Sequence, residues 1–152
     1  MYEEKMNIKE QLINDLKSAM KQQDKIRMKV IRMVLSSIKL AEVEKGEELD
    51  SLRLLAILQK EVKTREETIA EAEKAGRPEM ISELEQEIDV IKEYLPKEMD
   101  DDELETIIDQ VISELNANSI KQMGQVIKEV ISRVAGRAAN DRISMIVKTR
   151  LS

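Results

Sequence analysis

The feature of this 152-residue sequence that most restricts its fold is a spacing of three and four residues between aliphatic side chains, repeated along nearly the whole chain. That spacing places apolar residues on one side of an α-helix, where they can pack against other helices. The clearest stripe consists of Met123, Val126, Ile127, Val130, Ile131 and Val134. With only 4 Gly, 2 Pro and 2 Tyr, and no Phe or Trp, the chain lacks the turn residues that strand-rich folds need. The sequence therefore predicts an all-α protein with an aliphatic core.

The first 95 residues are predicted to form four helices. The first should run from about Glu4 to Gln22. The second half of the third helix, residues 63–74, is polar and is expected to project from the core. The expected boundaries between helices are capping residues, turn glycines and a proline in a first helical turn: Asp24, Gly46, Asp50 or Ser51, Gly76 and Pro78.

The periodic pattern is interrupted at Leu95-Pro96-Lys97, and this interruption predicts a boundary between two domains, residues 1–95 and 96–152. Proline cannot continue a helix comfortably, because it lacks the backbone N–H and its ring clashes with the preceding turn. Beyond it we expect a C-terminal domain of three helices. Their expected first residues or caps are Asp100, Ser119 and Asn140, and the second of them should end before Gly136.

Side chains for catalysis are scarce. The sequence has no His and no Cys, which excludes the usual acid–base and nucleophilic groups, disulfides and thiolate metal sites. Four isolated glycines cannot form a phosphate-binding loop, and the run Asp100-Asp101-Asp102-Glu103 lacks the spacing and glycine of a calcium loop. We therefore expect no catalytic residue, metal or cofactor. No apolar run approaches the roughly 20 residues that span a bilayer, so we expect a cytoplasmic protein without a membrane segment.

Charge is segregated beyond Pro96. Residues 96–118 contain one basic and eight acidic residues, whereas residues 119–152 contain seven basic and two acidic ones. Lys121 and Lys128 lie seven residues apart, hence on nearly the same side of one helix. Two interpretations remain open: a solvated surface that balances the acidic helix, or a surface that contacts phosphates. Two Tyr cannot stack single-stranded bases, so a nucleic-acid partner would be a structured RNA.

Several short motifs, by their order and spacing, resemble the YqeY family over essentially the whole chain. They are Leu16-Lys17-Ser18-Ala19-Met20-Lys21, Arg32 before Ser36-Ser37-Ile38-Lys39, Lys60 with Lys63 and Arg65, Gly76-Arg77 and Glu93-Tyr94-Leu95-Pro96. The last third also resembles the tail module of GatB, the tRNA-engaging subunit of bacterial glutamyl/aspartyl-tRNA amidotransferase. The shared segments are Ser119 to Val126, Gly136-Arg137-Ala138 and Ile146-Val147-Lys148 before Leu151.

The resemblance to GatB implies that the tail engages the elbow of a tRNA, and we assign Lys121, Lys128, Arg137 and Lys148 as candidate phosphate contacts. Gly124 lies inside a strong helix, where glycine costs about 1 kcal/mol relative to alanine. Either another helix approaches it closely or a ligand reaches its backbone. The family often has Asp-Gly after Gly-Arg-Ala, whereas this chain has Ala139-Asn140, in which Asn140 can still cap a helix.

Three functions follow as hypotheses. The leading one is a noncatalytic accessory protein that binds tRNA or structured RNA through the basic tail, with residues 1–95 as a second docking surface. The alternative is a protein-interaction adaptor, in which residues 63–74 or the acidic helix after Pro96 meet a partner protein. The third is an amidotransferase-type activity, a carbon–nitrogen ligase chemistry with glutamine as nitrogen donor. In GatB that reaction belongs to a separate cradle domain, and no segment of this chain resembles it.

Overall fold

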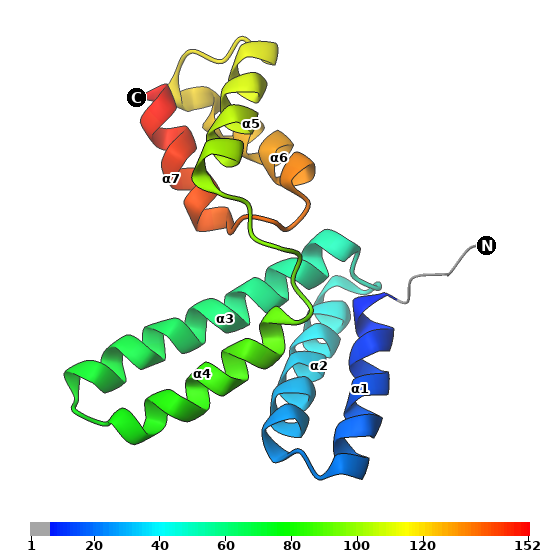
Figure 1. Cartoon of the computed structure of the whole chain (residues 1–152). Helices are drawn as coiled ribbons and strands as arrows, with labels where there is room; N and C mark the ends of the chain where they lie inside the picture. Colours follow the sequence, from blue (N-terminus) through cyan, green and yellow to red (C-terminus); the bar gives the residue numbers. More distant parts are fainter. Residues whose placement is uncertain (1–6) are drawn as a thin grey trace. The chain divides into compact units, whose positions relative to one another are not determined.

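The computed structural model describes residues 7–152, which form seven α-helices, a short 3₁₀ turn and no strand (Figure 1). The all-α prediction is therefore confirmed. The chain separates into two units, Met1–Leu95 and Pro96–Ser152. The first unit contains α1 (Ile8–Gln22), α2 (Lys25–Lys45), α3 (Ser51–Lys74) and α4 (Pro78–Lys92). The second contains α5 (Asp101–Glu114), the 3₁₀ turn Ile120–Gln122, α6 (Met123–Val134) and α7 (Asn140–Leu151).

Local sequence signals set most helix boundaries. Asp24, Asp50 and Asp100 accept hydrogen bonds from the backbone N–H three residues later, at 3.1, 2.9 and 2.8 Å. These bonds satisfy N–H groups that have no partner within the first turn of a helix. Gly46 and Gly76 adopt left-handed φ values of +78° and +67° after α2 and α3. These cap and glycine predictions are confirmed.

The sequence placed three helix starts at Glu4, Ser119 and Asn140. The expected start at Glu4 lies outside the described residues, and α1 begins at Ile8 after Asn7, whose side chain accepts from the Glu10 N–H. Asn140 was expected to cap α7, but this prediction is wrong. Ala139 already has the extended backbone of a cap, and its carbonyl accepts from the Ile143 N–H, so Asn140 is the first helical residue. Ser119 precedes the 3₁₀ turn but makes no side-chain capping bond.

The N-terminal unit consists of two helical hairpins, α1–α2 and α3–α4, and α2 packs against both α3 and α4. Its core is aliphatic, as the composition requires. The far end of the α3–α4 hairpin extends away from α1 and α2 (Figure 1). Residues 63–74 therefore project together with α4, and Ala72 is buried within this hairpin. The buried core residues are Leu12, Val30, Ile31, Val34, Ile38, Leu54, Leu58, Val62, Ile88, Val90 and Ile91.

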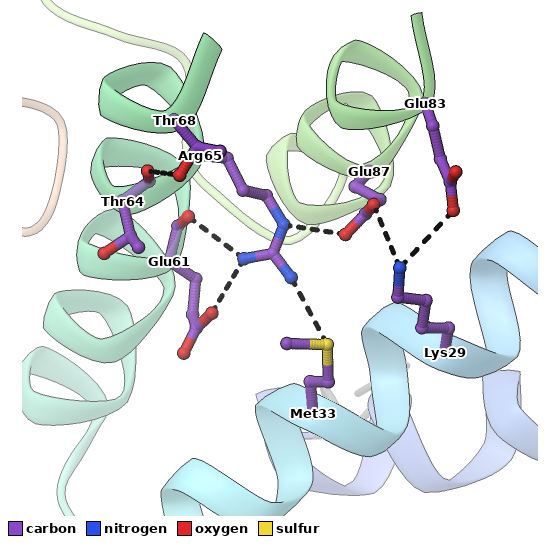
Figure 2. Close-up of polar contacts among 8 residues, drawn as sticks. All are labelled: Lys29, Met33, Glu61, Thr64, Arg65, Thr68, Glu83 and Glu87. Carbon is purple, nitrogen blue, oxygen red and sulfur yellow. Dashed lines mark hydrogen bonds and ion pairs between the residues drawn. The ribbon is translucent and has the colours of Figure 1, made fainter. Parts of the chain in front are cut away.

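A charged cluster joins α2, α3 and α4 inside this unit (Figure 2). Arg65 and Glu87 are only 5% and 4% exposed, and the Arg65 Nε donates to Glu87 Oε1 at 3.1 Å. The same guanidinium donates to the Glu61 carboxylate at 2.7 Å and to the Glu61 carbonyl at 3.1 Å. Lys29 reaches the second oxygen of Glu87 at 3.5 Å, and Arg65 also contacts the sulfur of Met33 at 3.6 Å. The buried charges are thus paired and hydrogen-bonded, as burial requires.

A tyrosine hydrogen bond fastens α1 to the end of α4. The half-buried Tyr94 hydroxyl donates to the carboxylate of Asp15. Burial of the phenol, together with this bond and the negative charge of Asp15, raises the pKa of Tyr94 above its ordinary value of 10.0. The neutral phenol is therefore the form that the folded protein favours.

This raised pKa predicts an alkaline instability. The folded state holds the Tyr94 proton more tightly than the unfolded chain, so the stabilisation is complete below about pH 10 and is lost as pH rises further. We expect the free energy of unfolding to fall more steeply above that pH in the wild type than in Tyr94→Phe. Urea unfolding of both proteins across the alkaline range measures the difference, and parallel curves would contradict the assignment.

The C-terminal unit has its own aliphatic core, in which α6 packs against both α5 and α7. The stripe that was clearest in the sequence supplies Val126, Val130 and Val134, which are at most 1% exposed. Because these residues fix which side of α6 faces inward, they also fix which side faces solvent. The other buried members are Met99, Leu104, Ile108, Val111, Ala138, Ile143, Val147 and Leu151.

Candidate nucleic-acid interface

The arginines of the C-terminal unit are held by carboxylates. Arg133 on α6 forms ion pairs with Glu114 at the end of α5 and, at 3.0 Å, with Glu129. Its hydrogen bond and charge hold the pKa of Glu114 below the usual range. Arg150 on α7 binds Asp109 of α5 at 2.9 Å, and this bond raises the pKa of the guanidinium. Both arginines therefore neutralise α5.

The two arginines nearer the α6–α7 loop are held in the same way. Arg137 pairs with Glu103 at 3.2 Å and donates from Nε to the carbonyl of Lys97 at 3.1 Å. Arg142 forms an ion pair with Asp101 in the first turn of α5. The acidic run after Pro96 is thus the electrostatic partner of the arginines, as the first of the two interpretations proposed.

The lysines of this unit behave differently. Lys121 in the 3₁₀ turn, Lys128 on α6 and Lys148 on α7 are all exposed. None of them takes part in an ion pair found within residues 7–152. Three positive side chains therefore remain available to an external anion.

Helix geometry places Lys128 and Lys148 away from α5. At about 100° per residue, Lys128 lies about 140° around α6 from Arg133, the residue that reaches α5. Lys148 lies about 160° around α7 from Arg150, which also reaches α5. Lys121 precedes Lys128 by seven residues, although the intervening 3₁₀ turn makes its angle less regular. We call Lys121, Lys128 and Lys148 the lysine face.

Of the four residues selected from the sequence, the three lysines are exposed and outside the ion pairs of residues 7–152, whereas Arg137 is ion-paired. Arg137 is bound to the α5 side through Glu103 and the Lys97 carbonyl. A role in phosphate contact for any of the four stays a prediction.

Gly124 lies in the first turn of α6, and the expected close approach of another helix is wrong. A Cβ built on Gly124 meets no heavy atom within 4 Å, so open space surrounds the position. The packing of this unit therefore does not require glycine there. The other interpretation from the sequence, access of a ligand to the backbone, remains a prediction.

The open space predicts the effect of Gly124→Ala. Alanine favours the helix by about 0.5–1 kcal/mol over glycine, and no clash offsets that gain, so the free energy of unfolding should rise by this amount. Gly46→Ala is the matched control, because it also meets empty space but has a φ of +78° and should destabilise the protein. Chemical denaturation measures both. A loss of stability in Gly124→Ala would show that α6 has a hidden steric constraint.

The charge count along the sequence overlooked a positive hairpin in the N-terminal unit. Residues 7–45, which contain α1 and α2, hold nine basic and five acidic residues. Residues 46–95, which contain α3 and α4, hold seven basic and fourteen acidic ones. The charge counts beyond Pro96 did not cover this hairpin, whereas a count for each predicted hairpin of residues 1–95 would have shown the contrast.

No group of three or more Asp or Glu side chains within residues 7–152 is arranged to hold a metal ion. Among the described helices, none combines the length and the apolar character needed to cross a bilayer.

Comparison with known proteins adds a family relationship. A family model described as Yqey-like protein matches residues 9–151. Three relatives, from Lachancea thermotolerans, Kluyveromyces lactis and Vanderwaltozyma polyspora, are each named Altered inheritance of mitochondria protein 41, mitochondrial. The first is 31% identical over 139 residues, which cover 89% of this chain and 74% of that protein. The second is 36% identical over 84 residues, which cover 55% of this chain and 45% of that protein. The third is 30% identical over 131 residues, which cover 81% of this chain and 66% of that protein.

Proposed function

The chain belongs to the Yqey-like protein family, and from this premise we propose that it is a noncatalytic accessory protein that binds tRNA or similarly structured RNA through the lysine face. The observation that carries the proposal is the separation of positive charge in the C-terminal unit. The arginines are neutralised by α5, whereas Lys121, Lys128 and Lys148 are exposed and outside the ion pairs that form among residues 7–152.

Free lysines are better phosphate ligands here than the arginines. A guanidinium already bound to a carboxylate must lose that partner before it can neutralise a phosphate, so its net gain is small. An exposed ammonium exchanges only mobile counterions, whose release drives nucleic-acid binding. We therefore assign phosphate contact to the three lysines and a structural role to Arg137, which ties the α6–α7 loop to Glu103 and Lys97.

The proposed partner is structured because this unit has no means of reading bases. Residues 96–152 contain no Phe, Trp or Tyr, so bases cannot stack on an aromatic side chain there. The protein would instead recognise the positions of the phosphates along a folded RNA. The resemblance of Ser119 to Val126 and of Gly136-Arg137-Ala138 to the GatB tail supports tRNA as the first RNA to test.

Salt dependence tests this proposal. With three phosphates neutralised, the affinity for tRNA should fall roughly 20- to 40-fold between 50 and 200 mM monovalent salt, because each contact releases close to one counterion. Filter binding or fluorescence anisotropy with bulk tRNA measures the slope. Affinity that is absent at low salt, or that does not change with salt, would reject phosphate contact as the mode of binding.

For the amidotransferase hypothesis, we assign no residue of this chain a catalytic role. We expect no glutamine- and ATP-dependent turnover with misacylated tRNA, and an assay of the purified full chain would decide it. Cytoplasmic location also remains our prediction, and the word mitochondrial in the names of the three relatives concerns those proteins.

A further inference from the structure

The α1–α2 hairpin carries a second group of free positive side chains. Lys17 and Lys21 on α1, and Lys25, Arg32 and Lys39 on α2, are all exposed. None of the five occurs in an ion pair of the described N-terminal unit. The hairpin therefore presents unneutralised positive charge, although the whole chain has a net charge of −6.

These residues follow the helix repeat. Lys25, Arg32 and Lys39 are spaced by seven, which keeps them in one stripe with a drift of about 20° per step. Lys17 and Lys21 are spaced by four and lie about 40° apart on α1. Each helix thus carries one line of positive charge.

The Lys9–Glu42 ion pair, at 2.8 Å, shows where the two helices meet and orients both lines. Lys39 lies about 60° around α2 from Glu42, on the side away from the buried residues of that helix. On α1, Ile13 and Met20 lie about 40° and 20° from Lys9. The lines on α1 and α2 therefore border the same outer surface of the hairpin.

Apolar side chains lie between and beside the positive ones. Ile13 is 40%, Met20 52% and Val43 71% exposed. Of the acidic groups nearby, Glu42 is engaged by Lys9 and Asp24 by Arg27. Glu10 is exposed and lies seven residues before Lys17, so one carboxylate stands at the start of the positive line on α1. We name the following set the basic–apolar face: Ile13, Lys17, Met20, Lys21, Lys25, Arg32, Lys39 and Val43.

We propose that the basic–apolar face docks an amphipathic α-helix of a partner protein, whose apolar stripe is flanked by Glu or Asp. Charge complementarity requires an anionic partner, and the exposed apolar side chains require one that also offers apolar surface. The seven-residue spacing of Lys25, Arg32 and Lys39 matches acidic residues repeated by seven along a partner helix, as in interhelical charge pairs of coiled coils.

Two other anionic partners fit less well. Phosphates of an RNA would neutralise the lysines but leave Ile13, Met20 and Val43 in water. A membrane surface needs a broad apolar side with large anchors, whereas the apolar sides of α1 and α2 form the core and the hairpin contains no Phe or Trp. Binding to RNA and binding to a membrane are therefore tested as alternative outcomes of the experiment.

The test uses the full chain and a designed, fluorescently labelled helical peptide with a leucine stripe flanked by glutamates. Fluorescence anisotropy should show saturable binding that weakens with salt. The variant Lys25→Glu/Arg32→Glu/Lys39→Glu should weaken it at least tenfold, as expected for three reversed charge contacts. Ile13→Gln/Met20→Gln/Val43→Gln should weaken it by a similar factor, because the apolar contacts are lost.

The matched control is Lys121→Glu/Lys128→Glu/Lys148→Glu, which changes the same number of exposed charges and should leave peptide affinity within twofold. Bulk tRNA and phosphatidylserine vesicles are titrated in parallel, and the reversal on α2 should leave both affinities within twofold. Circular dichroism verifies that each variant is folded. The proposal is overturned if the peptide does not bind, if a peptide with glutamine for glutamate binds equally, or if the α2 reversal acts on tRNA or vesicles instead.

Discussion

Replacing Arg65 with alanine is expected to lower the free energy of unfolding by about 3–5 kcal/mol, because it leaves a buried carboxylate without its main partner. Glu87 is 4% exposed, and its Oε1 accepts from the Arg65 Nε at 3.1 Å. Lys29 reaches only the other oxygen, at 3.5 Å, and cannot replace the guanidinium. The same substitution removes the bond from Arg65 to Glu61 and opens a cavity between α3 and α4 (Figure 2).

Urea denaturation of wild type and Arg65→Ala measures this loss. The matched control is Arg53→Ala on the same helix. The Arg53 side chain is exposed and outside the ion pairs formed by the described residues, so its removal should cost no more than about 0.5 kcal/mol. Arg65→Met combined with Glu87→Leu should recover most of the stability, since an apolar pair leaves neither charge unpaired. A cost for Arg65→Ala as small as that of the control would mean that water replaces the guanidinium without penalty.

The sequence predicted the helices and many of their ends because those features depend on neighbouring residues. Asp24, Asp50 and Asp100 act within the next turn, and Gly46 and Gly76 act through their own φ. The start of α7 was predicted wrongly because two neighbouring residues can each take the cap position. Ala139 adopts the cap conformation one residue before Asn140, although asparagine is the better capping side chain.

The site depended on contacts between residues far apart in the sequence, which its local patterns do not specify. Arg65 and Glu87 are 22 residues apart, and Arg142 and Asp101 are 41 apart. From the sequence, Arg137 resembled the lysines, because nothing local indicates that Glu103 and the Lys97 carbonyl bind it. Only the folded unit distinguishes a positive residue that is neutralised from one that is free.

The difference between ion-paired arginines and free lysines predicts the largest effect on RNA binding. Lys121→Glu/Lys128→Glu/Lys148→Glu should weaken tRNA binding by at least about 100-fold in 50 mM salt, because it removes three counterion-releasing contacts and adds repulsion. Stability should change little, since the three lysines are exposed and take no part in the ion pairs of the described part of the chain. The salt slope should fall toward zero in the same variant.

The control for this prediction is Arg137→Gln, which alters a positive residue of the same unit that is already bound to Glu103. We expect its affinity for tRNA to stay within about twofold of wild type, because an arginine already neutralised has little counterion release to lose. Its stability should fall slightly through loss of the bond to the Lys97 carbonyl. If Arg137→Gln weakened RNA binding as much as the triple reversal, the anion would have to displace Glu103, and the lysine face would not be the binding surface.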